Sequence, residues 1–315
     1  MARIAYLGPE GTFTEAALLQ IAGAGQIPGG DAIRVPTDST PAALDSVRRG
    51  DVAFACVPIE NSIDGSLAPT LDSLGAGSPL QVFSETTLDV SFSIVVKADR
   101  TAAEVATLAA FPVAAAQVRQ WIAEHLPGAQ LRPAYSNADA ARQVAEGRVD
   151  AAVTSPLAAA HWELTELARG VVDESNARTR FVLIGPPGTP PARTGSDRTS
   201  VVLRLQNVPG ALLLALSEFG IRGIDLTRVE SRPTRTGLGT YMFFVDCVGH
   251  IDDDAVAEAL KALHRRCADV RYLGSWPTGE PVGALPPSAS EASAWLTRLR
   301  RGEVGLADGK GQTQR

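Results

Sequence analysis

The feature that most constrains the fold of this chain is a unit of one helix and one strand that occurs twice. In its first copy, Ser39-Thr40-Pro41 predicts a helix N-terminus, because serine caps helices and proline suits their first turn. Gly50 then predicts the end of that helix. The apolar run from Val52 to Val57 predicts a buried strand that stops at Pro58. A capped helix followed by such a strand is typical of an α/β fold.

The second copy lies near the middle of the chain and keeps the same order. Ser136-Asn137-Ala138-Asp139 opens a helix, Gly147 ends it, and a strand around Ala151-Ala152-Val153 ends at Ser155-Pro156. Chance matching of alanine-rich segments is the alternative, but a true repeat predicts two similar α/β lobes. Each lobe would then present a helix N-terminus to the cleft between them, which suits a ligand with two negative groups.

Another helix N-terminus is predicted close to the start of the chain. Ile4 to Leu7 has the pattern of a buried strand, Gly8 to Gly11 of a turn, and Thr12 to Glu15 of a capping box. Free backbone N–H groups at such a turn bind anions, although a plain connection between strand and helix is the alternative. The glycine spacing of a dinucleotide site is absent.

Two further segments place polar side chains at strand ends. Glu60-Asn61-Ser62 follows the first repeated strand, so we expect a loop there, either a polar site or a plain capped turn. Thr179-Arg180-Phe181 begins the apolar run Phe181 to Ile184. We expect the Thr179 hydroxyl and the Arg180 guanidinium to emerge together at one end of this strand, where small ligands bind to α/β sheets. The alternative is that Thr179 merely begins the strand.

The totals exclude several classes of function. A length of 315 residues allows two domains, and 45% hydrophobic with 20% charged residues describes an ordinary globular protein. A net charge of −6 disfavours nucleic-acid binding by the whole chain. Cys56, Cys247 and Cys267 are widely spaced and odd in number, which indicates neither a disulfide framework nor a zinc site. With no signal peptide and no apolar run long enough for a bilayer, we expect a cytoplasmic protein without a membrane role.

The hydrophobic pattern changes after a proline-rich linker, residues 186–199. From 200 to 277 the predicted order is βαββαβ, which is the ferredoxin-like plan. The remaining residues, 278–315, predict one short helix at 292–299 and an otherwise partly disordered tail.

Four motifs occur in a specific order along the chain. They are Gly8-Pro9-Glu10-Gly11-Thr12-Phe13, Val57-Pro58-Ile59-Glu60-Asn61-Ser62, Thr179-Arg180-Phe181 and Glu230-Ser231-Arg232-Pro233. This order resembles the prephenate dehydratase family in its monofunctional form. The resemblance implies an α/β catalytic domain at 1–185 with two lobes, like a periplasmic binding protein, the second lobe covering about 80–158. It also implies a ferredoxin-like ACT regulatory domain at 200–277.

The resemblance implies conversion of prephenate to phenylpyruvate, CO2 and water without metal or organic cofactor. Thr179 would hydrogen-bond the leaving hydroxyl, and positioning and preorganised electrostatics would supply most of the acceleration. Arg180, Thr12 and the helix opened by Ser136 would hold the carboxylates, Asn61 and Ser62 would orient the substrate, and Phe181 would form an apolar wall. Glu60 would be either a proton donor or a structural acceptor. Arogenate dehydratase and a non-catalytic intracellular amino-acid sensor are the alternative functions.

The resemblance also implies allosteric binding of L-phenylalanine between two ACT domains, in a homodimer or a dimer of dimers. The implied effector residues are Asn207, Pro209, Gly210, Ala211, Leu212, Glu230, Ser231 and Arg232. One departure is Phe111-Pro112, where many relatives carry His-Pro. The four histidines, His125, His161, His250 and His264, match no motif, so we expect chemistry that needs no histidine.

Overall fold

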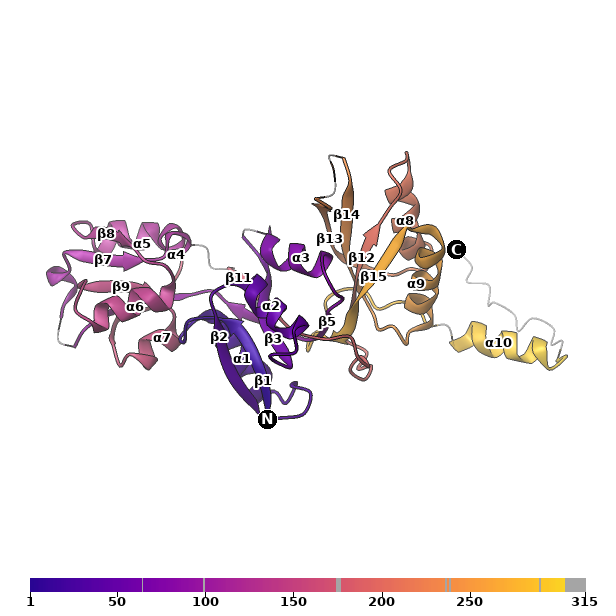
Figure 1. Cartoon of the computed structure of the whole chain (residues 1–315), viewed down its shortest axis with the longest axis horizontal. Helices are drawn as coiled ribbons and strands as arrows, with labels where there is room; N and C mark the ends of the chain where they lie inside the picture. The colour runs from indigo at the N-terminus through magenta and orange to yellow at the C-terminus, as the bar shows by residue number, and fades with distance from the viewer. Residues whose placement is uncertain are drawn as a thin grey trace, which may run out of the picture.

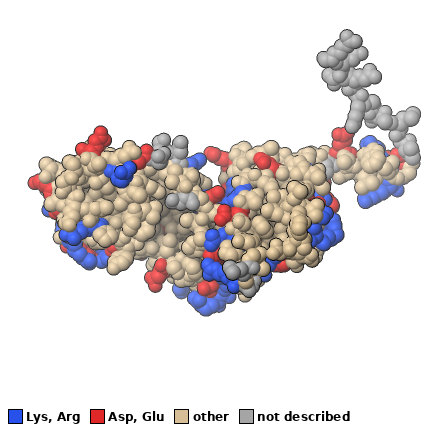
Figure 2. Space-filling view, turned by 90° about the horizontal axis from the view of Figure 1, so that it is seen from above, with Lys and Arg blue, Asp and Glu red and all other residues tan. Residues whose placement is uncertain are grey.

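Three β-sheets follow one another along the long axis of the molecule (Figure 1). The computed structural model describes residues 1–303 apart from 64, 99, 174–176, 236, 238 and 289. Acidic and basic side chains are interspersed over the face shown in Figure 2, as expected of a solvated surface. Within the described part of the chain, no helix is long and apolar enough to cross a membrane.

The first lobe is built on a six-stranded sheet with the order β2-β1-β3-β11-β5, and β4 pairs with β3. Its strands are β1 (Ala2–Leu7), β2 (Ala32–Thr37), β3 (Phe54–Asn61), β4 (Gly65–Ser66), β5 (Gln81–Asp89) and β11 (Arg178–Gly185). Its helices are α1 (Phe13–Gly23), α2 (Thr40–Arg48) and α3 (Ala68–Gly75). β11 returns from the second lobe and pairs antiparallel with both β3 and β5.

The second lobe is a five-stranded sheet with the order β10-β6-β9-β7-β8. Its strands are β6 (Phe92–Val96), β7 (Thr107–Ala110), β8 (Gln130–Pro133), β9 (Ala151–Thr154) and β10 (Thr165–Val171). Its helices are the 3-10 turn η1 (Ala102–Glu104), α4 (Pro112–Gln117), α5 (Arg119–His125), α6 (Asn137–Ala145) and α7 (Pro156–His161). The lobe thus runs from β6 to β10, not over 80–158 as predicted, because β5 belongs to the first sheet and β10 pairs with β6.

The helix–strand unit predicted to occur twice is present in both lobes. The Ser39 and Ser136 hydroxyls accept hydrogen bonds from the third backbone N–H of α2 and α6. Both helices end in a left-handed glycine, with φ of 76° at Gly50 and 71° at Gly147. The prediction that the first strand stops at Pro58 is wrong. β3 continues to Asn61, because Pro58 lies beside a bulge in the pairing with β11 and beyond the last residue paired with β1.

The C-terminal module is a four-stranded antiparallel sheet with the order β13-β14-β12-β15. Its elements are β12 (Asp197–Arg204), α8 (Ala211–Gly220), β13 (Leu226–Pro233), β14 (Tyr241–Val248), α9 (Asp254–Arg266) and β15 (Asp269–Pro277). This order confirms the predicted βαββαβ plan. Beyond it, α10 (Ser290–Arg300) extends away from the body in Figure 1. The part of the predicted tail at 304–315 lies outside the described residues.

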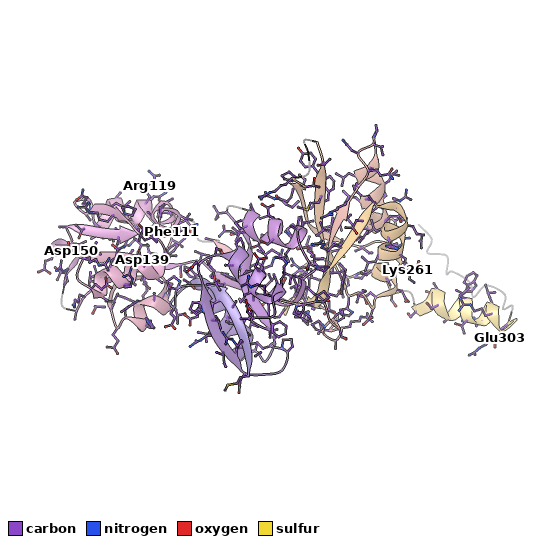
Figure 3. The ribbon with its side chains drawn as sticks, viewed as in Figure 1. Phe111, Arg119, Asp139, Asp150, Lys261 and Glu303 are labelled. Atoms are coloured by element: carbon purple, nitrogen blue, oxygen red, sulfur yellow. The ribbon has the colours of Figure 1, made fainter. Side chains whose placement is uncertain are left out.

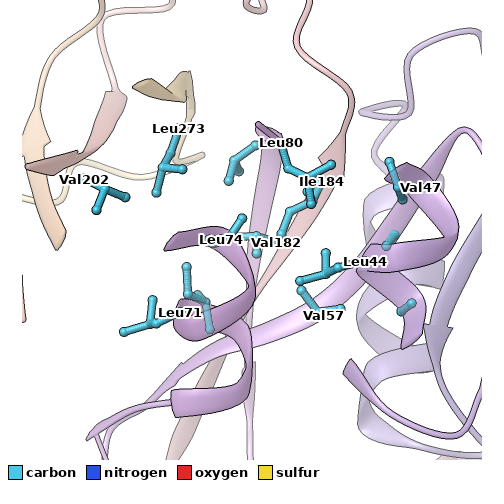
Figure 4. Close-up of a cluster of buried hydrophobic side chains, with 14 of the residues drawn as sticks. Leu44, Val47, Val57, Leu71, Leu74, Leu80, Val182, Ile184, Val202 and Leu273 are labelled. Carbon is cyan, nitrogen blue, oxygen red and sulfur yellow. The ribbon is translucent and has the colours of Figure 1, made fainter. Parts of the chain in front are cut away.

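The C-terminal sheet is covered on both faces. Val201 and Leu203 pack with α8 and α9, whereas the intervening Val202 packs against the first lobe. On that second face, Phe244 and Trp276 belong to one apolar cluster with Leu71, Leu74 and Leu80 of the first lobe. Figure 4 shows this cluster, with Val202 and Leu273 of the module labelled. A fully buried side chain of this size stabilises the fold by about 1.5–3 kcal/mol. The module and the first lobe therefore share a hydrophobic core.

Candidate functional site

A cleft of about 940 Å³ separates the two lobes. Its walls include Thr12 and Phe13 from the first lobe and Phe111, Ser136 and Arg142 from the second. Figure 3 labels Phe111 at the edge of the second lobe that faces the first. Two of the predicted site residues, Thr12 and Ser136, thus line one space although they are far apart in the sequence.

The N-terminus of α1 forms the first wall of this cleft. Thr12 Oγ1 accepts a hydrogen bond from Glu15 N at 3.3 Å and donates one to Leu7 O at 3.0 Å. The Glu15 carboxylate accepts from Gly11 N at 2.7 Å, one residue before the position expected in a capping box. The helix dipole and the first N–H groups of α1 therefore meet the cleft at a well-fixed turn.

The N-terminus of α6 forms the opposite wall. Ser136 Oγ accepts from Asp139 N at 2.9 Å, and the Asp139 carboxylate accepts from Tyr135 N at 3.1 Å. Asp139 also pairs with Arg142. Burial raises the pKa of the Asp139 carboxyl, but the bonds from Tyr135 and Arg142 outweigh this and lower its pKa. This wall therefore combines the N-terminus of α6 with the Arg142 guanidinium, which the Asp139 carboxylate holds in place.

Several cleft residues were missed by reasoning from sequence. Phe13, Phe111, Trp162, His161 and Arg142 all line the cleft. His161 Nε2 lies 3.9 Å from the Glu10 carboxylate, so this pair spans the two lobes. Phe13 stands next to Thr12 in the first motif, which was a usable signal. The others lie on helices of the second lobe or cap them, and only the fold shows which helix ends face the cleft.

Thr179 lies just after the chain re-enters the first lobe and is 8% exposed. Its Oγ1 accepts a hydrogen bond from Asn61 Nδ2 at 3.0 Å, because Thr179 and Asn61 are register partners on β11 and β3. Ser62 binds the neighbouring residue, with its Oγ accepting from Arg178 N at 2.8 Å. Three predicted site residues are thus together, at the strand crossing and outside the residues that line the cleft described above.

The expectation that Thr179 and Arg180 emerge together is wrong, because successive side chains of a strand point to opposite faces. Phe181 packs with α1, on the face that Thr179 also occupies, and Val182 packs toward the C-terminal module, as Arg180 does. Phe181 is a core residue of the first lobe and not a wall of the cleft. Arg180 likewise does not line the cleft, and its guanidinium is bound by carboxylates on the far side of the sheet.

Glu60 was expected in a loop, but it lies on β3. Its carboxylate is 2.8 Å from Arg180 Nη2. Of the two roles considered for Glu60, this contact favours the structural acceptor.

The predicted effector residues separate into two groups. Asn207, Ala211 and Leu212 line a pocket of about 350 Å³ at the N-terminus of α8, whose cap is Gly210. Tyr241 and Phe243 of β14 close its other side. Pro209 and Gly210 connect the lining residues without being part of the lining.

Glu230, Ser231 and Arg232 lie on β13, an edge strand of the sheet, and do not line that pocket. Arg232 instead binds Asp72 of α3 with N–O distances of 2.9–3.0 Å. Within one chain this arginine joins the module to the first lobe, and its predicted effector contact with a facing ACT domain stays a prediction. Among the described residues, no group of three or more His, Cys, Asp or Glu could hold a metal ion.

Comparison with known proteins identifies the family. Residues 4–189 match the family model "Prephenate dehydratase", and residues 199–265 match "ACT domain". A prephenate dehydratase of Mycobacterium ulcerans (strain Agy99) is 78% identical over 306 residues, covering 96% of this chain and 97% of the relative. The crystal structure of an Arthrobacter aurescens prephenate dehydratase with L-Phe has 38% identity and a TM-score of 0.84, covering 95% of this chain and 100% of that one. A structure described as GqqA, a quorum-quenching acylase, has 28% identity and a TM-score of 0.75, covering 88% of this chain and 98% of that one.

The resemblance predicted from four motifs is thus confirmed over nearly the whole chain. Two lobes, a C-terminal βαββαβ sheet and the matched family model all agree. The chain therefore belongs to the prephenate dehydratase family, and its C-terminal module is an ACT domain.

Proposed function

We propose that the chain dehydrates prephenate with Thr179 as the group that assists the leaving hydroxyl. In this reaction the bond from the ring to one carboxylate breaks, CO2 leaves, and the electron pair enters the ring. The ring hydroxyl departs with a proton as water, and phenylpyruvate remains. Hydroxide is a poor leaving group, so a hydrogen-bond donor placed at that oxygen lowers the barrier.

The observation that carries this proposal is the bond from Asn61 Nδ2 to Thr179 Oγ1. Because Asn61 donates, Thr179 accepts, and its own O–H remains able to donate to another oxygen. Within the described part of the chain, no contact uses that proton. Thr179 is buried where the chain crosses between the lobes. Closure of the two lobes on a substrate would therefore change the surroundings of its hydroxyl.

The carboxylates of prephenate would lie at the N-termini of α1 and α6. Thr12 and Ser136 cap these two helices from opposite walls of one cleft. Two positive helix ends suit a dianion, and Arg142 adds a guanidinium on the second wall. We therefore assign to Arg142 the carboxylate-binding role that the resemblance implied for Arg180.

The test is turnover of prephenate by Thr179→Ala and Thr179→Ser. We expect the alanine variant to lose about 100-fold or more in kcat, since it removes a transition-state contact. Serine keeps the hydroxyl and should restore most of that loss. An alanine variant that folds and retains near-normal kcat would falsify the role of Thr179. Arogenate as a parallel substrate tests the alternative dehydratase, and no turnover of either substrate would favour the sensor.

We also propose that L-phenylalanine, the ligand in the Arthrobacter aurescens structure, binds the pocket at Asn207, Ala211 and Leu212. The pocket lies at the end of β12 and the start of β14, and a second copy of the chain would complete it with Glu230 and Ser231 of its own β13. This arrangement requires a homodimer or a dimer of dimers. Leu212→Glu should raise the phenylalanine concentration for half-inhibition by about tenfold, because a charge replaces an apolar wall. Light scattering measures the assembly, and a monomer that phenylalanine still inhibits would refute the shared site.

The three cysteines bear on where the protein works. Cys56, Cys247 and Cys267 are all free thiols. Free thiols are typical of a reducing compartment, and this supports the cytoplasm as the location.

A further inference from the structure

Six charged side chains meet where the first lobe contacts the ACT domain, and we call them the junction cluster. The first lobe contributes Glu60, Glu85 and Arg180, and the ACT domain contributes Arg198, Arg228 and Asp246. Three arginines face three carboxylates, so the cluster is neutral as a whole. All its members except Glu60 are buried.

Asp246 of β14 is the centre of the cluster and is fully buried. Its carboxylate accepts from Arg228 at 2.9 and 3.0 Å, from Arg180 Nη2 at 2.8 Å and from Ser200 Oγ at 2.6 Å. Burial raises the pKa of Asp246, but Arg228 and Arg180 outweigh it and hold the pKa well below its usual range. The Asp246 carboxylate therefore links β14 to β12 and β13 of the ACT sheet and to β11 of the first lobe.

Arg180 binds Asp246, and its backbone neighbour Thr179 lies on the opposite face of β11. Its guanidinium lies 2.8 Å from both Asp246 and Glu60, and 3.2 Å from Glu85. The register pairs Arg180 with Glu60 and, one step along, Thr179 with Asn61. Residues 179–180 of β11 and 60–61 of β3 thus contribute to the junction cluster on one face of the sheet and form the Asn61–Thr179 hydrogen bond on the other.

The same strand of the ACT domain also reaches the effector pocket. Tyr241 and Phe243 of β14 line that pocket, and Asp246 lies further along the strand. Asp246 and Arg180 are both buried, and separating them breaks a charge-assisted hydrogen bond away from water, so a shift of Asp246 is resisted unless Arg180 follows it. The cluster also has spare donors. Arg180 Nε, Arg198 Nε and Arg228 Nη1 have no partner among the described residues, so alternative pairings are available within it.

We propose that Arg180 is a positioning residue that fixes Thr179 from the opposite face of β11, and that Asp246 ties this position to β14 and the effector pocket. The proposal rests on the catalytic role proposed for Thr179. A shift of the ACT sheet moves Asp246, Arg180 follows, and the Thr179 hydroxyl leaves the geometry that catalysis needs.

The test uses a charge-balanced double variant, Asp246→Asn with Arg228→Gln. It removes one charge of each sign, so the cluster stays neutral and no unpaired charge is buried. We expect kcat to fall by about tenfold or more with little change in KM, because misplacement affects the transition state more than binding. Phenylalanine should still bind by calorimetry but inhibit less.

The same pair of substitutions is then made in the Thr179→Ala background. If the junction cluster acts through the Thr179 hydroxyl, it has nothing to position once that hydroxyl is absent. In the Thr179→Ala protein, the two added substitutions should therefore change kcat by less than about twofold. Asp72→Asn is the matched control, because it removes another carboxylate at the same domain boundary, bound to Arg232 and away from β11. It should leave kcat near that of the unaltered protein.

An equal fall in kcat with and without Thr179 would overturn the proposal, as would a folded double variant with unaltered kcat and inhibition. If the double variant does not fold, Arg180→Lys carries the same two-background comparison. Failure of the catalytic assignment is seen separately, as near-normal kcat in Thr179→Ala alone.

Discussion

Gly11 gives a prediction whose size follows from the structure. It lies in the turn before α1 with φ of 85°, and a Cβ placed on it would lie 2.8 Å from Ala158 Cβ and 2.9 Å from Ala158 Cα. Ala158 belongs to α7 of the second lobe, and Ser155, which caps this helix, also donates to Gly11 O. Gly11→Ala therefore strains the backbone and pushes the two lobes apart where the turn before α1 meets α7.

Gly29 separates these two effects. It has φ of 88°, yet a Cβ there would meet nothing within 4 Å. The left-handed conformation costs a side chain about 1–2 kcal/mol, and Gly29→Ala should lose this amount alone. Gly11→Ala should lose about 1–3 kcal/mol more from overpacking.

The assays are urea unfolding followed by circular dichroism, and kcat/KM for prephenate. Because the lobes must be correctly spaced to hold both carboxylates, kcat/KM should fall by about tenfold or more in Gly11→Ala and stay unchanged in Gly29→Ala. Equal losses of stability in the two variants, with kcat/KM intact in both, would refute the claim that Gly11 sets the approach of the lobes.

Three other predictions follow from single contacts. Ser136→Ala and Ser39→Ala each remove a helix cap and should each cost about 1 kcal/mol of stability, but only Ser136→Ala should raise KM, since Ser39 does not line the cleft. The pKa of the Asp139 carboxyl is lower in the folded protein than in the unfolded chain. This difference stabilises the fold at any pH above the unfolded pKa, and the stabilisation is lost as the pH falls through the folded pKa. Asp139→Asn should therefore be less stable than the unaltered protein at neutral pH, and the gap should close in acid unfolding curves. A thiol reagent should label half-buried Cys267 in the native protein and buried Cys56 only after unfolding; equal labelling rates would contradict the packing around Cys56.

The sequence predicted the two lobes and the ACT domain because their signals are local. Serine caps, left-handed glycines and apolar strands recur at matching positions, and each acts within a few residues. The course of β3 past Pro58 could not be predicted in this way. Proline is tolerated there only because β1 has ended and a bulge faces β11, and both facts depend on strands far away in the sequence.

The site was predicted less well, for a physical reason that was available from the start. Neighbouring strand residues face opposite ways, so Thr179 and Arg180 could not both reach one ligand from a regular β11. The alternation alone would have separated them into Thr179 with Phe181 and Arg180 with Val182. What the sequence could not supply was the partner, because Asp246 comes from the other domain.

Asp246 itself was a usable signal. It interrupts the apolar run from Met242 to Val248, and an aspartate in a strand buried on both faces needs a cationic partner. Without the ACT domain, Arg180 would keep Glu60 and Glu85 but lose Asp246, and Leu71, Leu74 and Leu80 would be exposed where Phe244 and Trp276 now pack. The ACT sheet thus completes both the apolar core and the charge balance behind β11. For this reason removal of the ACT domain is a poor test of regulation, whereas substitutions within the junction cluster change the connection and leave the shared core in place.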